Sequence, residues 1–205
     1  MMNTPLEICI LAAGKGTRMK TLVPKMLQPI AGAPMIAHVV STARALKATK
    51  THLVVSEDYA GLKAAIEDQD DLNWVVQKEQ LGTGHAVQQA APSINIDAAV
   101  LVLLGDVPLL SPETLQPLFE DRADVAVLTV NAQNPAGYGR IQRNAAGQVL
   151  GIVEDKDATA AERAISEINT GIFRINPGLL PGLLARLTND NGQAEYYLTD
   201  IVSIA

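Results

Sequence analysis

The chain has 205 residues, of which 48% are apolar and 19% charged, so it is long and apolar enough for one globular domain with a real core. Its single cysteine, Cys9, excludes an internal disulfide framework, and its formal net charge of −6 argues against general binding of nucleic acids. Because no segment approaches the roughly 18 apolar residues of a membrane span and no signal peptide is visible, we expect a cytoplasmic protein that engages no membrane.

The first part of the chain alternates strand and helix patterns. The expected strands are Leu6–Ala12, Thr51–Val55, Asn73–Gln77, Ala98–Leu104 and Asp124–Val130. The helices expected between them lie at 34–46, 58–66 and 83–91, and a fourth follows the start signal Ser111-Pro112-Glu113. Repeated units of this kind predict a parallel sheet with right-handed crossovers.

The pattern changes after about residue 130. Two strand patterns, Tyr138–Gln142 and Gln148–Val153, flank turn residues 144–147 and predict a hairpin. A short helix, a strand and two further helices are expected at 159–164, 167–175, 179–187 and 196–204. We therefore predict one α/β domain over residues 1–205, in which a smaller mixed half closes over the parallel half.

Positive charge gathers in the loop after the first strand. Between Ile8 and Ser56 there is no Asp or Glu, so this stretch carries +7 and leaves −13 for the rest of the chain. Gly14 and Gly16 let the backbone turn sharply and approach a ligand. The cations that follow the strand most closely are Lys15, Arg18, Lys20 and Lys25. A flexible backbone with cations beyond the carboxyl end of a strand predicts a site for a nucleotide triphosphate.

Two common phosphate motifs nearly fit this loop, whose sequence is LAAGKGTRM at 11–19. The dinucleotide fingerprint G-x-G-x-x-G and the P-loop G-x-x-x-x-G-K-[ST] both require glycine at position 19, where Met19 stands. That glycine permits close packing or close approach of the backbone, which a Met side chain obstructs. A dehydrogenase or a P-loop kinase is therefore not expected.

The loop and the following Lys25 resemble the sugar-1-phosphate pyrophosphorylases. More narrowly, they resemble the uridyltransferase domain of the bifunctional N-acetylglucosamine-1-phosphate uridyltransferase/glucosamine-1-phosphate acetyltransferase family. Further blocks continue this resemblance, in order, along nearly the whole chain. They are QKEQLGTGHA at 77–86, GDVPL at 105–109, GYGRI at 137–141, GIVE at 151–154, EINTG at 167–171 and EYYLTD at 195–200.

The resemblance implies a Rossmann-like nucleotidyltransferase fold, with a mixed, mostly parallel sheet flanked by helices. It also implies a reaction that requires Mg²⁺, in which N-acetylglucosamine-1-phosphate attacks the α-phosphorus of UTP in line. The products are UDP-N-acetylglucosamine, a precursor for peptidoglycan and lipopolysaccharide, and pyrophosphate. Such a transfer depends on positioning and charge neutralisation more than on covalent catalysis.

By the same resemblance, the half up to about residue 130 binds the nucleotide. Backbone amides of the loop, with Arg18, would hold the triphosphate, and Lys25 would stabilise the reacting phosphates. A primary amide and a glycine backbone match the edge of uracil, which points to Gln77 and the Gly82-Thr83 pair, although a wide pocket would also accept thymine. The nucleotide-binding candidates are Leu11, Ala12, Ala13, Gly14, Gly16, Thr17, Lys25, Gln77, Gln80, Gly82, Thr83, Leu104 and Gly105.

Asp106 follows the long apolar strand, at the edge where open α/β sheets bind ligands. A carboxylate there suits Mg²⁺, which takes one or two protein oxygens together with phosphate and water. From spacing alone, the alternative is an Asp that only caps the turn before Ser111. With the resemblance, Asp106 is the candidate metal ligand, and the candidate catalytic set is Arg18, Lys25 and Asp106.

The half from about 131 to 205 should hold the sugar, whose hydroxyl and N-acetyl groups require fixed amide and carboxylate partners. From the residues alone, Glu154 is a loop carboxylate and Asn169 a turn residue. The resemblance implies that the Gly139 backbone, the Glu154 carboxylate and the Asn169 amide bind the sugar. The same wall is completed by the candidates Thr170, Tyr197 and Thr199.

Two features depart from the family pattern. Leu104 stands where a tyrosine often precedes Gly-Asp, which concerns one side contact near the nucleotide. The family's second metal ligand, an asparagine, and its left-handed β-helix domain, which carries acetyl transfer and trimer formation, would lie beyond Ala205. We therefore expect either a fragment of a longer, trimeric protein or a stand-alone relative, with weak or no uridyltransferase activity as given.

Two other functions stay open. A different nucleotidyltransferase of the same fold would use CTP, dTTP or GTP, and would share the first loop and Gly-Asp without the ordered LGTGHA and EINTG blocks. A non-catalytic domain would bind a nucleotide sugar for regulation or assembly without releasing pyrophosphate.

Overall fold

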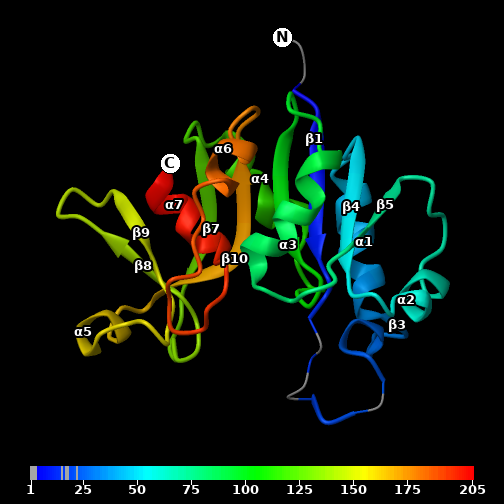
Figure 1. Ribbon diagram of the computed structural model, residues 1–205, viewed down its shortest axis with the longest axis horizontal. Helices are drawn as coiled ribbons and strands as arrows, with labels where there is room; N and C mark the ends of the chain where they lie inside the picture. Colours follow the sequence, from blue (N-terminus) through cyan, green and yellow to red (C-terminus); the bar gives the residue numbers. More distant parts are fainter. Residues whose placement is uncertain (1–3, 15, 17–18, 22) are drawn as a thin grey trace.

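Strand β1 (Leu6–Leu11) lies inside a mixed sheet of eight strands. The computed structural model describes residues 4–14, 16, 19–21 and 23–205. β1 pairs in parallel with β4 (Lys50–Val55) on one side and with β6 (Ala99–Leu104) on the other, and β5 (Leu72–Val76) continues the parallel sheet beyond β4. These four strands form the parallel sheet that the alternating first half predicts (Figure 1).

The long strand β10 (Glu167–Ile175) joins the second half to this sheet. It pairs antiparallel with β6 near its carboxyl end, with β7 (Val125–Asn131) along its length and with β8 (Arg140–Arg143) near its start. β8 forms the predicted hairpin with β9 (Val149–Val153), which lies at the left edge of Figure 1. The two halves therefore share one continuous sheet.

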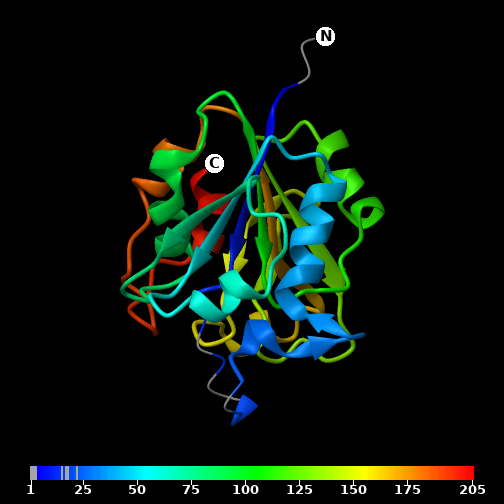
Figure 2. The same ribbon diagram turned by 90° about the vertical axis from the view of Figure 1, so that its right-hand side faces the viewer.

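Alternate residues of β1 supply the cores on the two faces of the sheet. Ile8 and Ile10 pack in one core with α1 (Met35–Ala45), α2 (Ala60–Ala64) and α4 (Pro112–Glu120). Cys9 and Leu11 pack in the other with α3 (Thr83–Ala90), α6 (Leu180–Leu184) and α7 (Ile201–Ile204). Figure 2 shows α1, in blue, on one side of the strands and the C-terminal end on the other. Complete burial raises the pKa of the Cys9 thiol to about 12, so Cys9 acts as a small apolar side chain.

Some predicted helices are shorter in the structure. α2 occupies only the middle of the stretch expected at 58–66, and α6 only the first part of the stretch expected at 179–187. The helix expected at 196–204 is divided into a 3₁₀ turn, η4 (Leu198–Asp200), and α7. Tyr196 remains outside the helix because its N–H donates to Leu81 O and its carbonyl accepts from Gly84 N, both at 2.8 Å. A residue that pairs on both sides with a distant loop cannot also make the bonds of a helical turn.

Four short elements were not predicted: η2 (Lys25–Leu27), the β2 (Pro29–Ile30) and β3 (Ala33–Pro34) hairpin, and η3 (Ala91–Ser93). The predicted helix at 159–164 is present as α5 (Ala160–Arg163) and begins with a capping box between Thr159 and Glu162. Across the part of the chain that the structure covers, none of the helices combines the length and apolar character needed to cross a membrane.

Candidate active site

The carboxyl ends of β1 and β6 lie at the same level, because Leu11 pairs with Leu104. Gly105 N donates to Leu11 O at 2.9 Å, which keeps the two loops that follow in contact. A Cβ at Gly105 would lie 3.0 Å from Met26 Sδ and 3.1 Å from Leu11 O, so only glycine fits this approach without displacing a neighbour. The edge predicted to bind a ligand is therefore built by close backbone packing.

A cavity of about 410 Å³ opens at this edge. It brings together most of the nucleotide-binding candidates from loops that are far apart in the sequence. Its lining consists of Leu11, Ala13, Gly14, Lys25, Met26, Gln77, Gln80, Gly82, Thr83, Ala86, Leu104, Asp106 and Glu195. Three of the described candidates are absent from this lining. Ala12 and Gly16 border a neighbouring cavity, and Gly105 packs against Met26 and Leu11 behind it.

Lys25 and Asp106 form an ion pair in this cavity although 81 residues separate them. Lys25 is the first residue of η2. Asp106 follows Gly105, which is the first residue after β6. Gly16, with φ at +60°, allows the loop after β1 to pass beside Lys25, since a Cβ there would lie 2.6 Å from Lys25 Cβ. The two side chains are 28% and 33% exposed, so Lys25 remains accessible to a phosphate group and Asp106 to a cation.

Asp106 offers a metal ion a single carboxylate, which is paired with Lys25. Within the described residues, no group of three or more His, Cys, Asp or Glu side chains is placed to enclose a metal. Mg²⁺ does not require such a cage, because it usually binds one or two carboxylates and completes its shell with phosphate oxygens and water. A single accessible carboxylate beside a lysine fits a magnesium ion that enters with a nucleotide.

Gln77 lies in the cavity wall and is only 3% exposed. Its Nε2 donates to Gly82 O at 3.2 Å and lies 3.0 Å from His85 Nδ1. Since Nε2 is thus engaged by the protein, the Gln77 carbonyl is the group that can accept a hydrogen bond from a ligand N–H, such as N3–H of uracil. His85 therefore helps to hold the Gln77 side chain in place.

Gln80 and Thr83 contribute mainly by holding backbone. Gln80 Nε2 donates to Ala13 O at 2.8 Å, which braces the loop after β1. Thr83 Oγ1 accepts from Leu198 N at 3.1 Å, which ties the start of α3 to the C-terminal segment. Both residues line the cavity, as predicted, but these side-chain atoms already bind protein partners.

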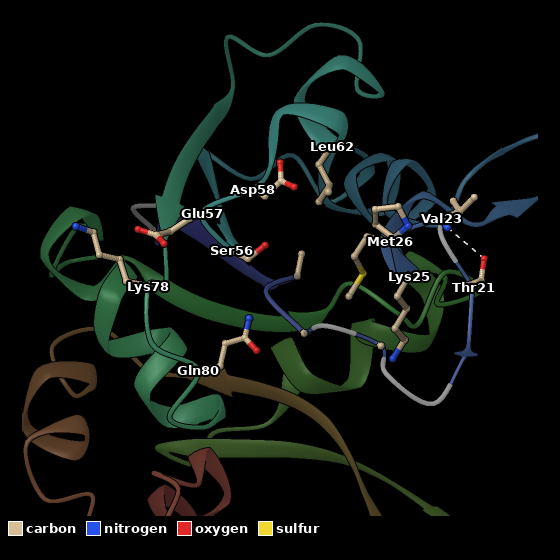
Figure 3. A pocket seen from close by; sticks show the side chains of 14 residues that line it. Thr21, Val23, Lys25, Met26, Ser56, Glu57, Asp58, Leu62, Lys78 and Gln80 are labelled. Carbon is tan, nitrogen blue, oxygen red and sulfur yellow. Dashed lines mark hydrogen bonds between the residues drawn. The ribbon is translucent and has the colours of Figure 1, made fainter.

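A second cavity, of about 480 Å³, adjoins the first and shares Gly14, Lys25, Met26 and Gln80 with it. Ala12 and Gly16 also border it. In Figure 3, Lys25 lies at one end of this cavity and Lys78 at the other, with Gln80 between them. Among the lining residues that were not predicted, four lie in the loops after β4 and β5: Ser56, Glu57, Asp58 and Lys78. Ser56–Asp58 directly follow β4, so the rule that placed Asp106 at a carboxyl edge could have found them.

A third cavity, of about 210 Å³, continues the first toward the second half of the chain. Both cavities share Leu11, Thr83 and Leu104, and a Cβ at Gly171 would lie 2.6 Å from Leu104 Cδ1. Five of the six sugar-binding candidates line this third cavity: Gly139, Glu154, Asn169, Thr170 and Thr199. The structure thus joins the two predicted sites along Leu104.

Hydrogen bonds fix the polar groups of this third cavity. Asn169 N donates to Gly139 O and Asn169 Oδ1 accepts from Gly171 N, each at 2.8 Å, which leaves the amide Nδ2 of Asn169 able to donate to a ligand. Thr199 Oγ1 donates to Glu154 Oε1 at 3.0 Å. Burial raises the pKa of Glu154; the Thr199 hydrogen bond opposes this shift, and three nearby carboxylates add to it.

Tyr197 does not line the third cavity, contrary to the expectation that it completes the same wall. Its side chain is buried and its hydroxyl accepts from Gln193 Nε2 at 2.8 Å, because the segment before η4 turns it away from the cavity. The Thr170 hydroxyl donates to Leu128 O at 2.7 Å and is therefore already engaged. Six further lining residues were not predicted, although each lies in a block that carries the family resemblance: Ala86, Gly137, Tyr138, Gly171, Glu195 and Leu198.

Three of the predicted loop residues, Lys15, Thr17 and Arg18, lie outside the described residues. The assignments of Arg18 to catalysis and of Thr17 to nucleotide binding therefore stay predictions.

Comparisons with known proteins concern the family and the fold of the chain. Residues 8–170 match the family described as the MobA-like NTP transferase domain. The Bifunctional protein GlmU of Marinobacter nauticus is 52% identical over 204 residues, covering 98% of this chain and 45% of that protein. The Bifunctional protein GlmU of Xanthomonas axonopodis pv. citri is also 52% identical over 204 residues, covering 100% of this chain and 45% of that protein. The chain thus spans less than half the length of these curated relatives.

A solved structure of UDP-glucose pyrophosphorylase complexed with UDP-glucose has a TM-score of 0.79 to this chain, with 18% sequence identity. The match covers 98% of this chain and 86% of the other. At this identity the similarity concerns the fold, and it confirms the Rossmann-like nucleotidyltransferase architecture that the sequence blocks imply.

Proposed function

The chain belongs to the family of MobA-like NTP transferase domains, and on this basis we propose that it transfers a uridylyl group from UTP to N-acetylglucosamine-1-phosphate. The observation that supports this proposal most is the continuity of the two cavities along Leu104. One cavity presents a buried amide, a lysine and a carboxylate, and the other presents groups suited to a sugar. A nucleotide and a sugar phosphate bound in them would meet at their phosphates.

The proposed reaction requires no general base, because the nucleophile is a phosphate oxygen that is already anionic. This oxygen attacks the α-phosphorus of UTP, a new P–O bond forms, and the bond to the β-phosphate breaks to release pyrophosphate. Lys25 would stabilise the charge on the reacting phosphates. Asp106 would hold Mg²⁺, which supplies further charge neutralisation when it is bound.

The remaining groups would orient the two substrates. The Gln77 carbonyl accepts from uracil, and the Gly82 backbone completes that edge. Glu154 and the Nδ2 of Asn169 hold the sugar through its hydroxyl and N-acetyl groups. Holding both reactants in line removes much of the entropic cost of the reaction, which is the main contribution a protein can make to this chemistry.

Release of pyrophosphate tests the proposal directly. With Mg²⁺ and UTP, we expect release to be faster with N-acetylglucosamine-1-phosphate than with glucose-1-phosphate, and faster than with CTP, dTTP or GTP in place of UTP. Binding of UDP-N-acetylglucosamine is measured in parallel. Tight binding without any release would favour the non-catalytic alternative, and release that prefers another nucleotide would favour the other nucleotidyltransferase.

The same resemblance extends the proposal to the surroundings of the reaction. We propose a cytoplasmic enzyme whose product serves cell-envelope synthesis, in a longer bifunctional protein that forms trimers through a further domain. The names and lengths of the curated relatives support a longer, bifunctional protein, and the compartment, the trimer and the role in the cell envelope come from the resemblance alone.

A further inference from the structure

The third cavity, in which the sugar is proposed to bind, is called the sugar cavity below. Arg140, the first residue of β8, is buried beside it and is only 1% exposed. A buried guanidinium carries a large desolvation cost unless its N–H groups are paired. Arg140 Nε has no hydrogen-bond partner among the described residues, so part of that cost is not offset. We propose that Arg140 and Asp155 act as positioning residues that hold the two loops of the sugar cavity and thereby set its affinity for the sugar.

The contacts of Arg140 link two loops. Its Nη1 donates to Tyr138 O, and its Nη2 lies 3.0 Å from Asp155 Oδ1. Tyr138 directly precedes Gly139, and Asp155 directly follows Glu154, both of which line the sugar cavity. The rigid, planar guanidinium of Arg140 therefore sets the distance between the Gly139 backbone and the Glu154 carboxylate, which are both proposed to hold the sugar.

The backbone register places Arg140 at the centre of the same region. Arg140 pairs with Val153 of β9 on one side and with Ile168 of β10 on the other. Glu154 directly follows Val153 at the end of β9, and Asn169 follows Ile168 within β10. The three residues proposed to bind the sugar therefore each lie next to Arg140 or next to one of its paired residues: Gly139, Glu154 and Asn169.

Asp155 completes the connection. The backbone N–H of Gly137, and then the Arg140 guanidinium, hold the pKa of the Asp155 carboxyl below its usual value. Its main-chain carbonyl accepts from Arg163 Nε and Nη2 at 3.2 and 3.1 Å, which ties it to α5 as well. Loop 137–139 and loop 154–155 are therefore coupled through charge-assisted contacts.

The same hairpin offers a matched control. Arg143, three residues along β8, is 41% exposed and makes a bidentate pair with Glu167, with both contacts at 2.8 Å. Neither Arg143 nor Glu167 lines the sugar cavity. An Arg143→Lys variant therefore makes the same chemical change on the same strand without reaching the proposed site.

The inference rests on the proposed function, and its experiment uses two ligands that differ only by the sugar. Calorimetry compares the affinities of the chain for UDP-N-acetylglucosamine and for UDP in the wild type, Arg140→Lys, Asp155→Asn and Arg143→Lys. We expect the first two variants to bind UDP-N-acetylglucosamine about five- to tenfold more weakly, the equivalent of one or two misplaced hydrogen bonds, and to keep their affinity for UDP. Arg143→Lys should match the wild type for both ligands.

The outcomes separate the inference from the proposed function. If Arg140→Lys fails to fold, Asp155→Asn tests the same ion pair through its other member, whose side chain is 32% exposed. Variants that keep the full preference for the sugar ligand would overturn the inference alone, as would an equal loss for both ligands, which indicates a merely structural role. A wild type that binds both ligands equally would overturn the proposed sugar site, and the inference with it.

Discussion

Gly82 lines the first cavity, and its replacement by alanine would place a methyl group against the backbone of Tyr196 in the C-terminal segment. Gly82 has φ at +107° and ψ at 175°, a conformation that residues with a side chain rarely adopt. Its Cβ would lie 2.6 Å from Tyr196 O and 2.9 Å from Tyr196 N. The strained dihedral costs about 1–3 kcal/mol and the overpacking about another 1–3 kcal/mol, so we expect Gly82→Ala to lower the free energy of unfolding by about 2–6 kcal/mol.

Urea denaturation of Gly82→Ala and a control, Gly178→Ala, measures the two contributions separately. Gly178 has φ at +80°, but no atom lies within 4 Å of the position that an added Cβ would take, so its substitution carries the dihedral cost without the clash. Any stabilisation through the unfolded chain is common to both variants and cancels in the comparison. Equal losses of stability in the two variants would refute the contact between Gly82 and Tyr196 as the cause.

Three further predictions concern the site. Lys25→Ala should lower the rate of pyrophosphate release by about 10²–10³-fold, the effect of removing one preorganised stabilising group; a rate near that of the wild type would remove Lys25 from the mechanism. Asp106→Asn should shift the Mg²⁺ dependence of that rate to higher concentration, and an unchanged dependence would refute the assignment of the ligand. Burial raises the pKa of Glu154 above 4.5, so its contribution to stability is lost as pH rises through the folded-state pKa. Glu154→Gln should therefore gain stability relative to the wild type as the pH rises above 4.5 in urea denaturation, and a difference that stays constant with pH would contradict this.

Much of the site follows from local patterns. The apolar run at 98–104 predicts a strand covered on both faces, and the carboxyl-edge rule then places Asp106 near the loop after β1. Gly105, which precedes Asp106, has no side chain, and its close approach to Leu11 requires this. These inferences succeed because the periodicity of burial and the steric demands of the backbone act over a few residues.

Other features of the site could not be predicted in this way. Tyr197 belongs to a block shared with the family, yet its side chain faces Gln193, because Tyr196 pairs with the loop before α3. A helical pattern at 196–204 contains no information about that distant partner. Glu195 was missed for the same reason, since only the path of the C-terminal segment brings it to the nucleotide cavity.

The amino-acid sequence by itself determined the α/β class, the order of the strands along the chain and the types of residue available for phosphate, uracil and sugar. These depend on local propensity, hydrophobic periodicity and the chemistry of individual side chains. Only the tertiary structure decided that Lys25 contacts Asp106, that Leu104 lines both cavities and that Arg140 contacts Tyr138 and Asp155 beside the third cavity. Such contacts join residues far apart in the chain, so they depend on the paths of loops that packing, and no local pattern, determines.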